Sequence, residues 1–163
     1  MNLRSLTLLA AVLLVAACAE DQTNKSSAAG TGSGAGGAQT TSTAQPGSEQ
    51  DLVQNVGDRV FFDYDKSDIK PEGRQILQRQ ADWLKKFANV TVTVEGHCDE
   101  RGTREYNLAL GERRATAVKK MLVALGVATN RVSTISYGKE RPAVVGSNEA
   151  AYAQNRRGVT VVN

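Results

Sequence analysis

The chain has 163 residues, of which 40% are hydrophobic and 23% are charged. This length predicts one folded domain with accessory segments, and no internal repeat is visible in the sequence. The net charge of +3 and the pI near 9.0 permit nucleic-acid binding. The N-terminal segment directs the chain out of the cytoplasm, which argues against that class of partner.

Residues 1–17 have the pattern of a secretory signal peptide. Arg4 supplies a short positive region, and residues 6–17 are apolar except for Thr7. This stretch is shorter than the roughly 20 residues that a membrane-spanning helix requires, although an uncleaved anchor remains the alternative interpretation. Small residues precede Cys18, an arrangement that resembles the lipobox of bacterial lipoproteins. The resemblance implies removal of the signal and acylation of Cys18.

The two cysteines of the chain have different expected roles. If Cys18 is acylated, Cys98 has no partner for an intramolecular disulfide, in spite of the oxidising compartment that export implies. We expect Cys98 to be a small buried thiol, with a reactive thiol as the alternative.

Residues 18–50 differ sharply in composition from the rest of the chain. They are rich in Gly, Ser, Thr and Ala and contain almost no large apolar side chain. Such a segment cannot bury enough surface to offset its ordering entropy, so the sequence predicts a flexible tether. The folded domain is then expected over residues 51–163.

Within that domain the patterns predict alternating strands and helices. Pro71 suits the first turn of a helix and Gly126 suits a helix C-cap. The predicted strands are 58–64, 90–96, 132–137 and 158–162, and the predicted helices are 71–88 and 104–125, with a helical turn at 149–154. This order, β-α-β-α-β-(turn)-β, predicts a two-layer α/β (α+β) sandwich with a mixed sheet. Strand–helix–strand units favour parallel neighbours, and the last strand, which follows only a long loop, is expected to be antiparallel.

The connection after the second predicted strand carries the polar residues 99–101. Gly102 allows a tight turn there, and Thr103 is a plausible N-cap of the following helix. On that helix Asn107, Leu110 and Arg114 form a row with spacing i, i+3, i+7. An acidic loop and a basic helix flank can therefore converge on one groove, which suits a ligand with both an ammonium and a carboxylate.

The same residues give little support to catalysis or metal binding. His97 is the only histidine, and its neighbour Cys98 points to the opposite face of a strand, so the two do not form a thiolate–imidazole pair. No GxSxG motif occurs, and no pair of carboxylates stands out. Consecutive His97, Cys98 and Asp99 lack the spacing of zinc ligands. We expect no enzymatic activity, no metal and no cofactor, and we expect His97 to orient the loop.

Several ordered motifs resemble the OmpA-like peptidoglycan-binding domain family, and most closely its subgroup of peptidoglycan-associated lipoproteins. They are VEGHCDERGT at 94–103, EYN at 105–107, LGERRA at 110–115, FFDYDKSDI at 61–69, SYGKERP at 136–142 and NRR at 155–157. Two positions depart from the family pattern, since Cys98 stands where the family more often has a small residue such as Ala or Thr, and Arg104 replaces a proline at the helix start.

The resemblance implies a non-covalent contact with diaminopimelate in the peptide stem of the cell wall. Asp99 is expected to pair with its ammonium, and Arg114 to bind a carboxylate through a bidentate fork. The resemblance also assigns four further ligand-lining positions, namely Arg101, Leu110, Tyr64 and Asp65. Asn107, Arg156 and Arg157 are first interpreted as structural, and Arg113 as a solvated residue or a member of a structural ion pair.

The resemblance further implies an outer-membrane lipoprotein that tethers this membrane to peptidoglycan. Ala19 after Cys18 lacks the aspartate of an inner-membrane retention signal, which favours the outer membrane. The implied protein partners belong to the Tol system and include a periplasmic propeller protein, in a role in envelope integrity and cell division. The alternative is a lipoprotein scaffold that mainly binds protein and has little direct contact with the wall.

Overall fold

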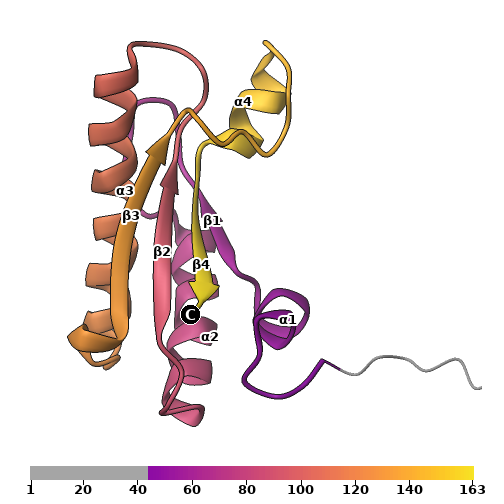
Figure 1. Cartoon of the computed structure of the whole chain (residues 1–163), viewed down its shortest axis with the longest axis vertical. Coiled ribbons are helices and arrows are strands. Elements are labelled where there is room, and N and C mark those ends of the chain that lie inside the picture. Colours follow the sequence, from indigo (N-terminus) through magenta and orange to yellow (C-terminus); the bar gives the residue numbers. More distant parts are fainter. Residues whose placement is uncertain (1–43) are drawn as a thin grey trace, which may run out of the picture. The chain divides into compact units, whose positions relative to one another are not determined.

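The computed structural model describes residues 44–163, which fall within one compact unit, Thr41–Asn163. Cys18, the predicted signal peptide and most of the predicted tether lie outside the described residues. The element order confirms the predicted alternation and adds an N-terminal helical segment (Figure 1). The elements are α1 (Glu49–Asp51), η1 (Leu52–Val56), β1 (Arg59–Phe61), α2 (Pro71–Lys86), β2 (Val92–His97), α3 (Arg104–Ala124), η2 (Thr129–Arg131), β3 (Val132–Gly138), α4 (Glu149–Asn155) and β4 (Arg157–Val162).

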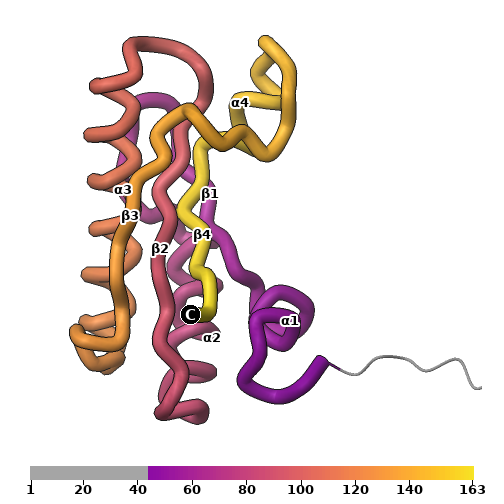
Figure 2. The backbone as a smooth tube through the Cα atoms, in the orientation of Figure 1, coloured from indigo at the N-terminus to yellow at the C-terminus, as the bar shows by residue number. Residues whose placement is uncertain are grey.

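The sheet has four strands in the order β1-β4-β2-β3, and the tube in Figure 2 follows β4 between β1 and β2. Strands β2 and β3 are parallel, whereas β4 is antiparallel to both of its neighbours. The mixed sheet and the antiparallel last strand are therefore confirmed. The expectation of parallel neighbours is wrong for β1 and β2, because the chain returns from α4 and inserts β4 between them.

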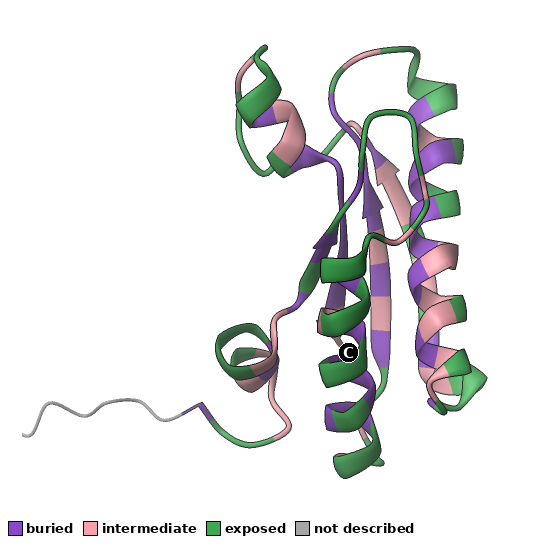
Figure 3. Ribbon diagram, turned by 180° about the vertical axis from the view of Figure 1, so that it is seen from behind, coloured by how far each residue is buried: buried purple, intermediate pink, exposed green. Residues whose placement is uncertain are grey.

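Helices α2 and α3 lie against one face of the sheet, and their buried stripes turn toward it (Figure 3). Val92 and Val94 on β2 are fully buried under these helices, whereas the intervening Thr93 and Glu95 belong to the opposite face and are only partly buried. This alternation places the hydrophobic core between the sheet and the helix pair, as a two-layer sandwich requires.

Helix α3 approaches the sheet closely because two glycines face each other at the contact. A Cβ atom built on Gly96 would lie 1.8 Å from the carbonyl oxygen of Gly111, and one built on Gly111 would lie 2.2 Å from Ser136 Oγ. No side chain larger than hydrogen fits at either position. The contact fixes the start of α3 against the end of β2, where the polar connection lies.

The N-terminal segment is tied to the domain by side chains at and just before the predicted start at residue 51. Glu49 Oε2 accepts a hydrogen bond of 2.6 Å from the backbone N–H of Val162, at the end of β4. Asp51 Oδ2 accepts from the indole N–H of Trp83 at 2.8 Å. These contacts make α1 part of the folded unit.

Candidate functional site

The connection from β2 to α3 is held by a set of local hydrogen bonds. Gly102 has a φ of 91°, a backbone conformation that favours glycine, and the Thr103 hydroxyl oxygen caps α3 by accepting from the N–H of Tyr106. The side-chain amide of Asn107 donates to the carbonyls of Arg101 and Thr103, both at 2.9 Å. The predicted turn and N-cap are confirmed, and Asn107 has the structural role expected for it.

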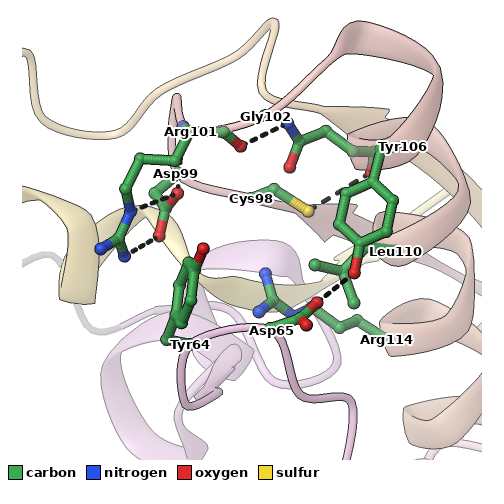
Figure 4. Close-up of a pocket in the computed structure, with 10 residues that line it drawn as sticks. Tyr64, Asp65, Cys98, Asp99, Arg101, Gly102, Tyr106, Leu110 and Arg114 are labelled. Atoms are coloured by element: carbon green, nitrogen blue, oxygen red, sulfur yellow. Dashed lines mark hydrogen bonds and ion pairs between the residues drawn. The ribbon is translucent and has the colours of Figure 1, made fainter.

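This connection forms one wall of a pocket of about 150 Å³ (Figure 4). The opposite wall is the loop between β1 and α2, and the floor comes from α3. The structure brings together all six side chains selected from the sequence, namely Tyr64, Asp65, Asp99, Arg101, Leu110 and Arg114. Cys98, Gly102, Tyr106 and Asn107 complete the lining.

Arg114 is fully buried, and its guanidinium joins separate segments of the chain. Its Nε donates to the carbonyl of Lys66 at 2.9 Å, and its Nη2 donates to the carbonyl of Asp63 at 3.1 Å. Its Nη1 donates to the carbonyl of His97 at 2.8 Å. No carboxylate lies within ion-pair distance of this guanidinium in residues 44–163.

The guanidinium of Arg114 consequently borders the pocket and is not neutralised by a direct ion pair. Burial lowers the pKa of the Arg114 guanidinium, although an arginine remains protonated at any pH the folded protein meets. A guanidinium has five N–H donors, and the three carbonyls account for three of them. The remaining donors suit an incoming carboxylate.

Asp99 is 4% exposed and is already paired with two arginines. Arg101 donates to it three times, from the backbone N–H and Nε to Oδ1, both at 3.2 Å, and from Nη2 to Oδ2 at 2.6 Å. Arg156 adds a contact of 3.3 Å to Oδ2. Burial opposes ionisation of Asp99, but these hydrogen bonds outweigh it and lower the pKa of the carboxyl.

The side chain of Arg101 lies between two aromatic rings. Its guanidinium carbon is 4.1 Å from the ring centroid of Tyr64 and 4.3 Å from that of Tyr152 on α4. Glu149 approaches it at 3.6 Å. Arg101 therefore covers Asp99 on one side, so an ammonium that pairs with Asp99 has to displace one of the arginine contacts.

Asp65 offers a second carboxylate on the opposite wall. It is the one non-glycine residue of the described chain with a positive φ, at 57°. This left-handed conformation is more accessible to aspartate than to most residues. Its carboxylate accepts from the hydroxyl of Tyr106, and Leu110 supplies the apolar floor between the walls. The pocket thus combines guanidinium donors, two carboxylates and an apolar surface.

His97 and Cys98 contribute to the site through their backbone and their packing. The ring of His97 lies outside the pocket lining, next to Tyr137 and 3.3 Å from Glu95 Oε2, while its carbonyl accepts from Arg114. Cys98 is a free buried thiol, 3.3 Å from the carbonyl of Asn107, and burial raises its pKa. The buried-thiol interpretation of Cys98 is confirmed.

No cluster of three or more His, Cys, Asp or Glu side chains in residues 44–163 is arranged to hold a metal ion. Among the same residues, no helix is both long and apolar enough to cross a membrane.

Comparisons with known proteins agree with this architecture. The model of the OmpA family matches residues 61–156, which is more than half of the chain. The peptidoglycan-associated lipoprotein of Brucella melitensis is 51% identical over 151 residues, covering 93% of this chain and 86% of the relative. The protein of the same name from Pasteurella multocida is 54% identical over 112 residues, covering 69% of this chain and 74% of the relative.

The chain belongs to the OmpA family, among the peptidoglycan-associated lipoproteins. The crystal structure of the peptidoglycan-associated lipoprotein from Burkholderia pseudomallei is 38% identical, with a TM-score of 0.65 over 69% of this chain and all of that chain. The C-terminal domain of Helicobacter pylori MotB, 24% identical with a TM-score of 0.61 over 65% of this chain and 84% of that chain, shares the fold. This OmpA-family protein is not an enzyme, in agreement with the sequence analysis.

Sequence reasoning missed one residue that lines the pocket of this OmpA-family domain and one contact that holds a lining residue in place. Tyr106 lies on the same helix face as Leu110 and Arg114, at spacings of four residues, so the helical periodicity could have identified it. Arg156 is not part of the lining and has the structural role expected for it, but that role includes a contact of 3.3 Å with Asp99. Its contribution depends on the position of β4 in the sheet, for which no local pattern provides a signal.

Proposed function

We propose that this protein binds peptidoglycan non-covalently through the diaminopimelate residue of the peptide stem. The observation that carries the proposal is the buried, unneutralised guanidinium of Arg114 at the floor of a pocket that also holds Asp65 and Asp99. The free end of diaminopimelate carries a carboxylate and an ammonium. Its carboxylate binds the remaining donors of Arg114, where low exposure to water strengthens a charge-assisted hydrogen bond.

The ammonium of the ligand then lies between Asp65 and Asp99. Asp65 is accessible without rearrangement, whereas contact with Asp99 requires Arg101 to give up part of its hydrogen bonding. Arg101 and Tyr64 close over the ligand from the side, and Leu110 contacts its aliphatic chain. The names of the relatives at 51% and 54% identity, which state an association with peptidoglycan, support this proposal.

The same proposal covers the rest of the molecule. Acylated Cys18 holds the protein in the inner leaflet of the outer membrane, and the domain links this membrane to the wall. Tol-system proteins, including a periplasmic propeller protein, are the proposed partners in envelope integrity and cell division. Many stems beside many anchored domains provide a high effective concentration, so a modest affinity per site is sufficient.

The test is co-sedimentation of the compact unit Thr41–Asn163 with purified sacculi of the diaminopimelate type. Free meso-diaminopimelate serves as a competitor. We expect the wild type to sediment, the competitor to release it, and Asp65→Asn and Asp99→Asn to reduce binding. Asp68→Asn is the matched control, because Asp68 is exposed, lies three residues from Asp65 and is not part of the pocket lining.

Three results decide between the functions considered. Loss of binding in the pocket variants alone, with unchanged circular dichroism, supports diaminopimelate binding. Equal sedimentation of all variants contradicts the assignment of the site. Failure of the folded wild type to sediment favours the protein-binding scaffold, in which the wall contact plays no part.

A further inference from the structure

A second cavity, of about 160 Å³, lies on the other side of the loop that bears Asp99. Cys98 lines both cavities, and beyond it the loop residues alternate. Asp99 and Arg101 line the first cavity, whereas Glu100 lines the second. The remaining lining residues of the second cavity are Lys139, Pro142, Val144, Val145, Gly146 and Asn155. A molecule that occupies the first cavity therefore needs to extend only across this loop to reach the second.

The apolar wall of the second cavity is held in place by a buried amide. Asn155 is 4% exposed, and its Oδ1 accepts from the N–H groups of Ala143 and Val144 at 2.7 and 3.1 Å. Its Nδ2 donates to the carbonyl of Val144 at 2.8 Å. The loop thus fixed leaves Val144 43% and Val145 92% exposed. Branched side chains with restricted rotamers on a fixed backbone form a preorganised apolar contact surface.

The charged side chains that line the cavity are Glu100 and Lys139, and the ammonium of Lys139 is the donor. The ammonium donates to the carbonyls of Glu100 and Gly102, at 3.1 and 2.7 Å, so two of its three N–H donors are engaged in hydrogen bonds. Within residues 44–163 no carboxylate lies at ion-pair distance from it, since Glu100 instead accepts from the hydroxyl of Tyr152 at 2.8 Å. One N–H donor of Lys139 remains for a ligand, and the charge of Lys139 has no direct ion pair, although the lysine is near enough to the Glu100 carboxylate to lower its pKa.

We propose that this second cavity binds the small D-amino acid that follows diaminopimelate in the stem, with its free terminal carboxylate on Lys139. The inference rests on the proposed function, because the diaminopimelate side chain in the first cavity places the stem backbone at the shared loop. The methyl group of D-alanine is small enough for the surface formed by Val144 and Val145. The protein then selects stems that end in an uncapped D-alanine, a selectivity that diaminopimelate binding alone does not provide.

The experiment compares three synthetic stem peptides by isothermal titration calorimetry with the unit Thr41–Asn163, which has its own hydrophobic core. The peptides are a tripeptide ending in diaminopimelate, a tetrapeptide ending in D-alanine, and the same tetrapeptide with a C-terminal carboxamide. We expect the tetrapeptide acid to bind about fivefold more tightly than the carboxamide, the size expected for one exposed ion pair.

Two variants assign that difference to the cavity. Lys139→Met is expected to make the acid and the carboxamide bind equally, whereas Lys120→Met, the control on an exposed face of α3, retains the fivefold ratio. Val145→Asp, at a position that is 92% exposed, is expected to weaken binding of the tetrapeptide acid through charge repulsion while tripeptide binding stays unchanged.

The outcomes separate this inference from the proposed function. If the wild type binds the tripeptide but does not distinguish acid from carboxamide, the second cavity is not a D-amino acid site and the proposed function stands. If Lys139→Met weakens all three peptides equally, the lysine only orders the Asp99 loop and the inference is overturned. If no peptide binds, the proposed function itself is overturned.

Discussion

Arg114 has two roles that a simple mutagenesis experiment would confuse. Its guanidinium is the proposed carboxylate site, but it also donates to three backbone carbonyls, two in the loop between β1 and α2 and one at the end of β2. Loss of sacculus binding in an Arg114 variant therefore has two possible causes. The carboxylate variants Asp65→Asn and Asp99→Asn are better tests of binding, and Arg114 is better examined through stability.

We predict that Arg114→Met lowers the free energy of unfolding by about 3 kcal/mol, because it leaves buried carbonyls without donors. Urea denaturation followed by circular dichroism measures the change. Arg113→Met is the control, since Arg113 is exposed on the same helix and its loss is expected to stay within about 0.5 kcal/mol. Equal losses in the two variants would show that the carbonyl contacts contribute nothing specific.

The lowered pKa of buried His97 predicts a distinct dependence of stability on pH. Burial, together with the nearby positive charge of Arg157, lowers the pKa of His97 from 6.5 to about 4. The unfolded chain therefore binds a proton between pH 6.5 and 4 that the folded chain does not bind. Stability due to this group is fully present above pH 6.5 and is lost as the pH falls through that window, with a slope of at most about 1.4 kcal/mol per pH unit.

The measurement is the urea midpoint from pH 7 to pH 4 for the wild type and for His97→Gln. Because His97 is the only histidine, the variant is expected to lose most of the slope between pH 6.5 and 4. Asp99 acts in a different range, since its pKa is lowered: its stabilising contribution is fully present above its unfolded pKa of about 3.9 and is lost only at lower pH. An unchanged slope in His97→Gln would mean that the ring is as accessible to protons in the folded state as in the unfolded state.

At the scale of elements, the features predicted correctly are those with local causes. Pro71 begins α2, Thr103 caps α3, and Gly126 ends α3 with a φ of 97°, because each acts within one turn of its own position. The six pocket residues also follow from short motifs and helical spacing. The position of β4 between β1 and β2 does not follow from any local pattern. Nor does the contact of Arg156 with Asp99, because it joins residues that are 57 positions apart in the sequence. Such contacts form only when the strands assemble into the sheet.

The segment α1 is also held by contacts with residues distant in the sequence, which local patterns do not predict. These contacts provide a prediction. A fragment that begins at Asp51, the predicted domain start, lacks the carboxylate of Glu49 and leaves the N–H of Val162 without its acceptor. We expect this fragment to be about 1–2 kcal/mol less stable than Thr41–Asn163. Urea denaturation of both fragments measures the difference. In the longer fragment, Glu49→Ala should reproduce part of this loss of stability. Glu49→Gln, which keeps an acceptor oxygen, should be more stable than Glu49→Ala. Equal stability of the two fragments would contradict a structural role for α1.

At the scale of the whole molecule, the proposed function requires two attachments on one chain. The pocket lies in the folded unit, while Cys18 is at the other end of the Gly- and Ser-rich segment. The composition of residues 19–43 predicts a coil with an r.m.s. span of about 30 Å. Membrane and wall can then be held by the same chain at once, and neither attachment depends on the other.

Because the two attachments are independent, a variant of either one is expected to abolish bridging between vesicles and sacculi while it leaves the other attachment intact. Vesicles that carry the acylated protein are expected to co-sediment with sacculi. Cys18→Ser should abolish this bridging while the protein itself still sediments with sacculi, and Asp65→Asn should abolish it while the protein stays on the vesicles. Asp68→Asn should bridge as the wild type does, because its carboxylate is outside the pocket. Bridging by Cys18→Ser would contradict the lipid anchor, because the folded unit alone would then have to hold both surfaces.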